Sequence, residues 1–178
     1  IPLGVKWIKE RVVDVKPEGN IVKLDSGREI TYDYLVMAPG LQLDWHKIQG
    51  LNETLGKNGV CSNYSYSLVG KTWEFISKFA GGTALFTQPN TPVKCGGAPQ
   101  KIAYLAEDYF NISGVRDRVK MIFASANPGI FSVPKYAATL NKVIARKHIN
   151  TMFRHDLIAV DGEAKRATFK HLDTGETV

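Results

Sequence analysis

The chain has 178 residues, a formal net charge of +6 and ordinary globular proportions of hydrophobic (44%) and charged (22%) residues. No apolar run approaches the roughly 18 residues that a membrane-spanning helix needs. The basic residues are scattered and no recognised nucleic-acid-binding module is present, so binding to nucleic acid is not favoured. Only two cysteines occur, far apart and without a C-x-x-C pair, which argues against a zinc site and a disulfide-rich secreted domain.

The first 40 residues predict β-structure. Their first strand is indicated by alternating apolar residues, namely Val5, Trp7, Val13 and Val15. Strands over 21–24 and 28–31 follow turns that contain glycine, so we expect a three-stranded antiparallel meander. The apolar run 34–38 then predicts a central strand buried on both faces.

Strands and helices alternate in the middle of the chain. Residues 66–80 place apolar side chains at three- and four-residue spacing, which predicts a helix that Gly81-Gly82 ends. The strands that follow are expected at 83–87, 119–124 and 150–153, with helices at 99–112 and 134–147. This alternation predicts a parallel sheet with right-handed crossovers.

The end of the chain echoes its beginning. Strands expected over 157–160 and 166–172 flank a turn, and their Leu-Asp-Thr-Gly ending resembles Leu-Asp-Ser-Gly at 24–27. Two unrelated β-hairpins would give the same sequence pattern. A repeated meander favours an α/β fold of two related, Rossmann-like dinucleotide-binding domains.

Cys95 lies between a predicted strand and a predicted helix. We expect the N–H groups of the first helical turn, with Lys94 and Lys101, to favour its thiolate over the thiol. Gly96 and Gly97 allow the backbone to approach whatever the sulfur meets. These features favour a reactive thiol, whereas the simpler alternative is a small buried hydrophobe at a corner of the fold.

The segment 90–101, Asn-Thr-Pro-Val-Lys-Cys-Gly-Gly-Ala-Pro-Gln-Lys, resembles the active-cysteine segment of flavin-dependent sulfide:quinone oxidoreductases of the bacterial and mitochondrial type. The resemblance extends more loosely over nearly the whole chain. It implies an enzyme that oxidises sulfide through a cysteine persulfide and passes the electrons through FAD to quinone. A second redox cysteine would then lie beyond Val178, and we expect the chain to be an internal fragment that is inactive alone.

The resemblance assigns roles to particular residues. It makes Cys95 the redox cysteine and Lys101 an electrostatic stabiliser of anionic intermediates. Glu53 falls where a carboxylate stands near the sulfide site, although a linker glutamate is usually solvated, and Cys61 matches an additional cysteine of more distant members only. The FAD contacts would come from Gly96 and Gly97, and from the turn Ala38-Pro39-Gly40, where Pro39 replaces the usual threonine.

A nicotinamide site is not expected. Prolines stand after residue 87 where a G-x-G-x-x-G turn would be needed, and the strand ending at Ala124 offers neither an acid nor an arginine to a ribose. This disfavours an NADH:quinone dehydrogenase of the same superfamily. A degenerate domain without catalysis is disfavoured by the surroundings of Cys95.

The resemblance also sets the expected domains and location. Residues 1–48 would be a remnant of the FAD-binding domain, 49–57 a linker and 58–178 the second, NAD-type domain. Sulfide and quinone would be the small-molecule substrates, parts outside this chain would touch the membrane surface, and a homo-oligomer is compatible. The expected location is peripheral, at the cytoplasmic face of a bacterial inner membrane or at the mitochondrial inner membrane.

Overall fold

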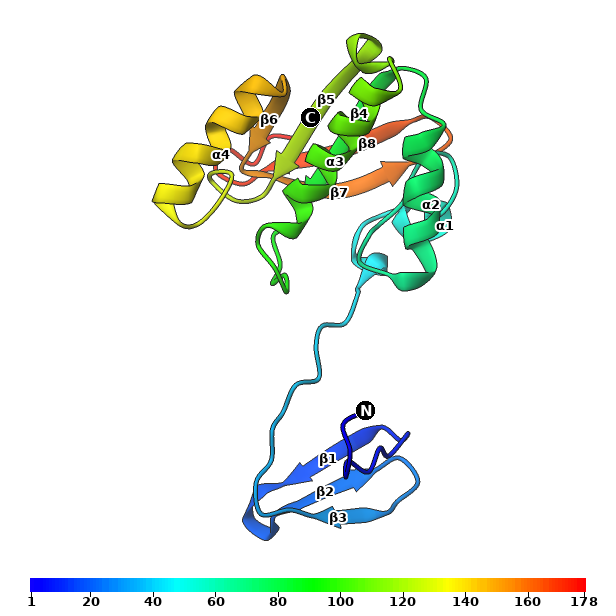
Figure 1. The fold of residues 1–178 in the computed structure, drawn as a ribbon, viewed down its shortest axis with the longest axis vertical. Helices are drawn as coiled ribbons and strands as arrows, with labels where there is room; N and C mark the ends of the chain where they lie inside the picture. Colours follow the sequence, from blue (N-terminus) through cyan, green and yellow to red (C-terminus); the bar gives the residue numbers. More distant parts are fainter. The chain divides into compact units, whose positions relative to one another are not determined.

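Figure 1 shows the computed structural model, which describes residues 1–178. The chain divides into two units, residues 1–40 and residues 41–178. This division falls earlier than the boundaries expected near residues 48 and 57. The difference arises because the segment 45–54 packs within the second unit.

The first unit contains the predicted meander. Its strands β1 (Val12–Lys16), β2 (Ile21–Leu24) and β3 (Glu29–Thr31) pair antiparallel in the order β1-β2-β3. The turn between β1 and β2 is a short 3-10 helix, η1 (Pro17–Gly19), followed by Asn20 in the left-handed conformation. Turn chemistry and alternation therefore predicted this unit's sheet correctly.

Two predictions for the first unit were wrong. Residues 5–8 form no strand, and Trp7 is exposed. The predicted buried strand over 34–38 is also absent, with Val36 89% exposed and Met37 67% exposed. An apolar run becomes a buried strand only when neighbouring strands satisfy its backbone and other layers cover its two faces, and the meander provides neither.

The second unit is built on a parallel sheet, as predicted. Strands β4 (Gly82–Gln88), β5 (Val119–Ser125) and β6 (Ile149–Phe153) pair in that order, with Gly82 opposite Val119 and Met121 opposite Ile149. Its helices α3 (Ala98–Ile112) and α4 (Pro134–Arg146) each lie within one residue of the predicted range. The periodicities of two and about 3.6 residues were clear enough here to fix both kind and position.

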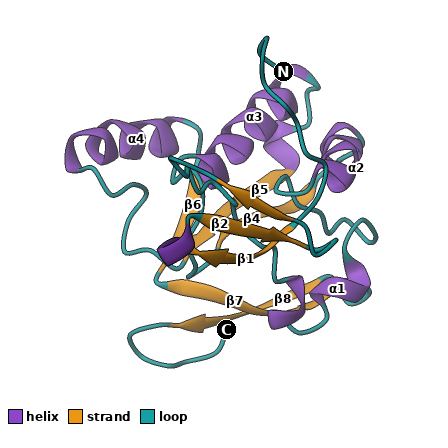
Figure 2. Cartoon of the chain, turned by 90° about the horizontal axis from the view of Figure 1, so that it is seen from below, coloured by secondary structure: helices purple, strands orange, loops and turns teal.

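Three layers make up this unit, and in Figure 2 the helices α3 and α4 lie above the strands β4–β6 and the hairpin of β7 (His155–Asp161) and β8 (Arg166–His171) lies below them. Helix α2 (Tyr66–Ser77) packs on α3, while α3 and α4 cover one face of the β4–β6 sheet. Behind the other face lies the antiparallel β7–β8 hairpin, with β7 in contact with β5. The core fills the space between helices and sheet. Its buried members are Ile76, Ala103, Ala106, Phe110, Val119, Met121, Phe123, Ile130, Ile144 and Ile149.

The segment expected as a linker has structure of its own. It holds the short helices η2 (Trp45–Lys47) and α1 (Leu51–Thr54), and α1 packs on β7. Gly50 has a φ of 73° and passes so close to β7 that a Cβ would lie 2.2 Å from the carbonyl oxygen of Val160. Only glycine fits both constraints, so this contact ties the segment to the hairpin.

The two hairpins share an irregularity. The pairing of β1 with β2 shifts register between Val12 and Asp14, and that of β7 with β8 shifts between Leu157 and Ala159. Such bulges are conserved features of a strand pair rather than accidents. The shared bulge supports the internal echo read from the sequence.

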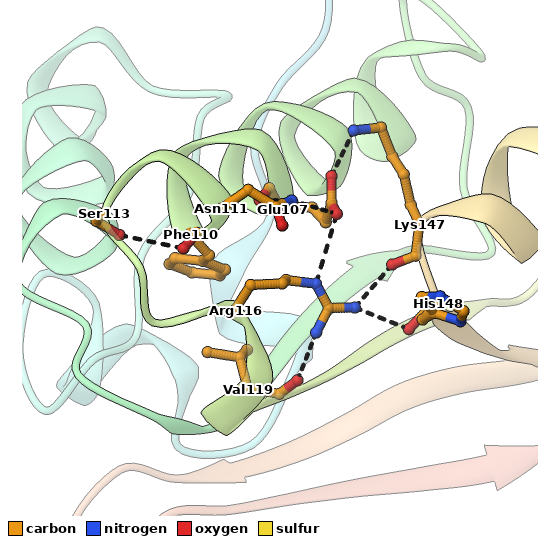
Figure 3. A network of polar contacts seen from close by, with 8 residues as sticks. All are labelled: Glu107, Phe110, Asn111, Ser113, Arg116, Val119, Lys147 and His148. Carbon is orange, nitrogen blue, oxygen red and sulfur yellow. Dashed lines mark hydrogen bonds and ion pairs between the residues drawn. The ribbon is translucent and has the colours of Figure 1, made fainter.

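A buried ion network joins α3 to the segments at the start of β5 and the end of α4, as Figure 3 shows. The Glu107 carboxylate, 5% exposed, pairs with Lys147 and with Nε of Arg116 at 3.5 Å, and it accepts a 2.6 Å hydrogen bond from Asn111. The Arg116 guanidinium, in the 3-10 helix η3 (Arg116–Arg118), also donates to the carbonyls of Val119, Lys147 and His148. One carboxylate thus links α3, the start of β5 and the end of α4.

Candidate functional site

Two loops meet at the carboxyl ends of the parallel strands. The cysteine loop, residues 89–97, leaves β4, and the loop 127–133 leaves β5. Their contact is direct, because a Cβ placed on Gly96 would lie 3.6 Å from Cε2 of Phe131. In open α/β sheets ligands bind at this edge, so the fold places Cys95 where a site is expected.

Cys95 is exposed and precedes the helix, as predicted, but the helix start differs from the expectation. Helix α3 has Gly97 as its N-cap, so Cys95 lies two residues earlier. The Cys95 carbonyl accepts a 3.0 Å hydrogen bond from the N–H of Ala98, and Pro99 has no N–H. Fewer free N–H groups therefore face the sulfur than expected, and charge from lysines matters correspondingly more.

A thiol, a cation and an aromatic ring gather around Gly97. The point that a Gly97 Cβ would occupy lies 3.6 Å from Cε of Lys101, 3.9 Å from Cε2 of Phe131 and 4.0 Å from Sγ of Cys95. The lysine predicted to act with the cysteine is therefore brought to the same small region as the sulfur. Lys94 is exposed beside Cys95.

The cysteine loop is anchored at its start. The backbone N–H of Asn90 donates a 3.1 Å hydrogen bond to a carboxylate oxygen of Asp156, on β7. One residue before the loop, the buried Gln88 accepts a 3.1 Å hydrogen bond at its carbonyl from the N–H of Ala126. The loop therefore leaves the sheet from a position fixed by both β5 and the hairpin.

Tyr64 is a neighbour of Cys95 that the sequence did not indicate. Its hydroxyl is buried and has no hydrogen-bond partner. Burial, and to a lesser degree charge on Cys95, raise the pKa of Tyr64, whereas the nearby backbone N–H of Cys95 opposes that change. The turn 61–65 thus brings a phenol to the cysteine loop.

Cys61 lies in a different environment. It is half-buried, and burial raises the pKa of its thiol, although the nearby hydroxyl of Thr72 on α2 partly offsets that effect. Raising the pKa of a thiol lowers its thiolate fraction and hence its reactivity at neutral pH. A redox role for Cys61 stays an untested prediction, and its surroundings do not favour it.

The other predicted residues do not gather at Cys95. Glu53 is exposed on α1, whose packing partners are η2 and β7, and no hydrogen bond or ion pair joins it to the cysteine loop. The residues Ala38, Pro39 and Gly40 are exposed at the end of the first unit. Their predicted roles toward sulfide and FAD stay predictions.

The place where a nicotinamide ribose would be held is filled by the protein's own contacts. The hydroxyl of Ser125, fully buried at the end of β5, accepts a 3.1 Å hydrogen bond from the N–H of Asn127 and lies 3.5 Å from Oε1 of Gln88. Prolines at 89 and 92 occupy the turn after β4. The edge offers neither the glycine turn nor the acid that binding of NAD requires.

Sequence reasoning also missed Gln100 and Phe131. Gln100 lies within the segment 90–101, but the spacing of apolar residues there did not indicate that its side chain is buried. Phe131 follows the turn 127–129 after β5, so its place at the sheet's carboxyl edge could have been inferred from strand order alone. The contact with the glycines depends on how that loop folds back.

Comparison with known proteins gives relatives over the whole length of the chain. It is 48% identical over 179 residues to the mitochondrial sulfide:quinone oxidoreductase of Dictyostelium discoideum, and 47% identical over 178 residues to that of Mus musculus. These alignments cover 100% and 99% of this chain, but only 40% of each relative. No family model matches.

A solved structure agrees with the sequence relatives. The sulfide:quinone oxidoreductase of Aquifex aeolicus superposes with a TM-score of 0.73 at 22% identity, covering 96% of this chain and 39% of that one. At this identity the likeness concerns the fold, an α/β arrangement with a parallel sheet. Over its whole length the chain is similar to sulfide:quinone oxidoreductases, and it spans about 40% of the length of the curated relatives it matches.

Proposed function

We propose that this chain is the part of a sulfide:quinone oxidoreductase that carries one of its redox cysteines, and that Cys95 is the residue at which sulfur is transferred. The observation that carries the proposal is the exposed Cys95 thiol, at the carboxyl edge of a parallel sheet and sharing the surroundings of Gly97 with Lys101. Exposure beside cations distinguishes reactive cysteines from inert buried ones.

The sulfur chemistry requires a second cysteine. Hydrosulfide would attack the disulfide between Cys95 and that partner, forming a new S–S bond as a persulfide on one cysteine and releasing the other as a thiolate. A nucleophilic acceptor would then take the outer sulfur of the persulfide, which breaks its S–S bond and leaves both cysteines as thiolates. Closing the disulfide between these two thiolates would release two electrons. The electrons would pass by way of FAD to quinone, so that sulfide is oxidised and quinone reduced.

The residues present fit one part of FAD and not another. Gly96 and Gly97 carry no side chains, and the points that their Cβ atoms would occupy lie near Phe131, Lys101 and Cys95, so a flat ring would approach this backbone beside the Phe131 ring. No G-x-G-x-x-G turn is present to hold a pyrophosphate. FAD would supply a two-electron acceptor next to Cys95, and a contact of FAD with Ala38, Pro39 and Gly40 stays a prediction from the sequence.

Lys101 would act through its charge. Thiolate and persulfide are anions, and an ammonium group held near them stabilises them most where few other charges compete. In support of this role, Cε of Lys101 and Sγ of Cys95 lie 3.6 Å and 4.0 Å from the point that a Gly97 Cβ would occupy. Glu53 would take part only if it approached the sulfide site in the whole protein.

The filled edge of the sheet supports a thiol rather than a nicotinamide as the source of electrons. Ser125 and Gln88 occupy the end of the strands with their own hydrogen bonds. This observation disfavours an NADH:quinone dehydrogenase. An assembly-only domain is disfavoured because it would have no use for an exposed thiol beside a lysine.

Location follows from the relatives and is proposed only in outline. The relatives from Dictyostelium and mouse are named as mitochondrial. In this chain, none of the helices has the length and apolar character to pass through a bilayer. We propose a peripheral position at an energy-conserving membrane, where a protein that delivers electrons to quinone must work.

The test is turnover in the complete flavoenzyme that contains this chain. Cys95→Ser keeps the shape of the side chain but cannot form a persulfide, so sulfide-dependent quinone reduction should fall by orders of magnitude while FAD content changes little. Lys101→Ala should lower the rate of sulfide-dependent quinone reduction about ten- to a thousandfold, the range for losing one electrostatic stabiliser. Cys61→Ser is the matched control and should turn over normally. Near-normal turnover of Cys95→Ser would refute the proposal.

A further inference from the structure

Gln100 is a buried amide that uses both ends of its side chain. It is 3% exposed in the first turns of α3. Its Nε2 donates a 3.1 Å hydrogen bond to the carbonyl of Ile130, and its Oε1 accepts a 2.6 Å hydrogen bond from the hydroxyl of Tyr104. The bond to Tyr104 fixes the orientation of the amide, so that its N–H points at the loop 127–133.

The residue after Ile130 is the one that meets the cysteine loop. Ile130 itself is 3% exposed and belongs to the core, which holds that end of the loop in place. Cε2 of Phe131 lies 3.6 Å and 3.9 Å from the points where Cβ atoms on Gly96 and Gly97 would stand. The ring therefore lies against the glycine backbone, and the second of those points is also 4.0 Å from Sγ of Cys95.

From this arrangement we infer that Phe131 is a specificity-determining wall beside the Cys95 sulfur and that Gln100 is the positioning residue that holds it there. The inference rests on the proposed function, because it assigns a consequence to access at Cys95. A ring in this position restricts one side of the sulfur and favours small sulfur species over bulky ones.

Two thiol reagents that differ only in size can measure how strongly Phe131 restricts access to the Cys95 sulfur. Methyl and cyclohexyl methanethiosulfonate both transfer a thioalkyl group to a thiolate and release methanesulfinate. The ratio of their rates is therefore independent of the thiolate fraction. The experiment uses the full 178-residue chain with Cys61→Ser, so that Cys95 is the only thiol that reacts.

The ratio of the methyl rate to the cyclohexyl rate should exceed that of a free cysteine peptide. Phe131→Ala should lower it about three- to tenfold, the effect on a rate of a contact of about 0.7–1.4 kcal/mol. Gln100→Met, which has a similar length but cannot form the two hydrogen bonds, should lower it in the same direction. The double variant should match Phe131→Ala alone, because Gln100 acts only through the ring.

The control lies on the same helix. Asn111→Leu removes an amide that bonds to Glu107 at the other end of α3, and it should destabilise the protein without moving the ratio. If Gln100→Met does not fold, Phe131→Leu should still give an intermediate ratio. An unchanged ratio in Phe131→Ala, or a further decrease in the double variant, would overturn the inference. Since no sulfide, FAD or quinone is present, this outcome is separate from failure of the proposed function.

Discussion

Replacing Glu107 by glutamine tests the energetic role of the network in Figure 3. The variant keeps the volume of the side chain and can still bond to Asn111, but it removes the negative charge. The ammonium of Lys147 and the guanidinium of Arg116 then remain with side chains only 20% and 14% exposed and without their counter-ion. A cation left in so little water carries a desolvation cost that no partner offsets.

The size of the effect follows from that burial. Removing one member of a fully buried ion pair costs about 3–5 kcal/mol. Arg116 keeps three bonds to backbone carbonyls, and Lys147 retains part of its hydration, so a cost at or just below the lower end of that range applies here. We expect the free energy of unfolding of the second unit to fall by about 2–3 kcal/mol. This corresponds to a melting temperature lower by about 4–12 °C.

The effect should depend on pH in a defined direction. Burial is the largest single influence on Glu107 and raises its pKa, but the bonds to Lys147 and Asn111 and the charges of Lys147 and Arg116 outweigh it and hold the pKa below its ordinary value of 4.5. A carboxylate whose pKa is depressed in the folded state contributes stability that is present above the unfolded-state pKa. That contribution disappears as the pH falls through the folded-state pKa. The difference between wild type and Glu107→Gln should therefore be constant near neutrality and shrink below about pH 4.

Helical circular dichroism during urea unfolding measures this, because all four α-helices belong to the second unit. The matched control is Glu74→Gln on α2, a surface carboxylate that pairs with Lys71 at 2.8 Å and Lys78 at 3.1 Å. Exposed pairs of this kind contribute little, so the control should change stability within experimental error. Equal losses for Glu107→Gln and Glu74→Gln, or a difference that does not shrink in acid, would refute the reasoning.

Two further predictions concern Cys61 and Gly162. Because burial raises the pKa of Cys61, iodoacetamide should label it more slowly than Cys95 at pH 7, as read by peptide mass spectrometry, and equal rates would contradict this. Gly162→Ala should destabilise the second unit by about 1–3 kcal/mol, since its Cβ would lie 1.8 Å from Oγ1 of Thr54. Thr54→Ala in the same chain should recover part of that loss, and urea unfolding that shows no recovery would rule out the clash as the cause.

The sequence was a good guide wherever a local pattern decided the structure. The alternation in 82–153 and the helical spacing in 98–112 predicted the parallel sheet and its helices to within a residue, because each element buries the face that its own pattern defines. The prediction of a buried strand over 34–38 was wrong because an apolar run indicates that a strand there would need to be buried, but not that neighbouring elements exist to bury it. The segment 49–57, expected as a linker, contains α1, and its contact with β7 is made through a glycine backbone, which leaves no apolar pattern in the sequence.

The residues near Cys95 in the sequence could be predicted to lie close to it, whereas those that reach the cysteine loop from distant segments could not. Cys95, Lys101 and the two glycines are consecutive or one helical turn apart, so a local motif could bring them together. Phe131 and Tyr64 reach the cysteine loop from distant segments, and Glu107 on α3 meets Arg116 in η3 and Lys147 at the end of α4. Such pairs have no characteristic spacing, and only the packed tertiary structure reveals them.

The claim that Cys95 accepts sulfur can be tested in one measurement. A polysulfide donor transfers one sulfane sulfur atom to a thiolate and is shortened by that atom, so no external oxidant is needed. After brief treatment and capping with iodoacetamide, the account predicts that the peptide with Cys95 gains the mass of one sulfur, about 32 Da for a Cys–S–S group. The peptide with Cys61 should gain none, and Cys95→Ser should abolish the gain. Sulfur found on Cys61 but not on Cys95 would contradict the account.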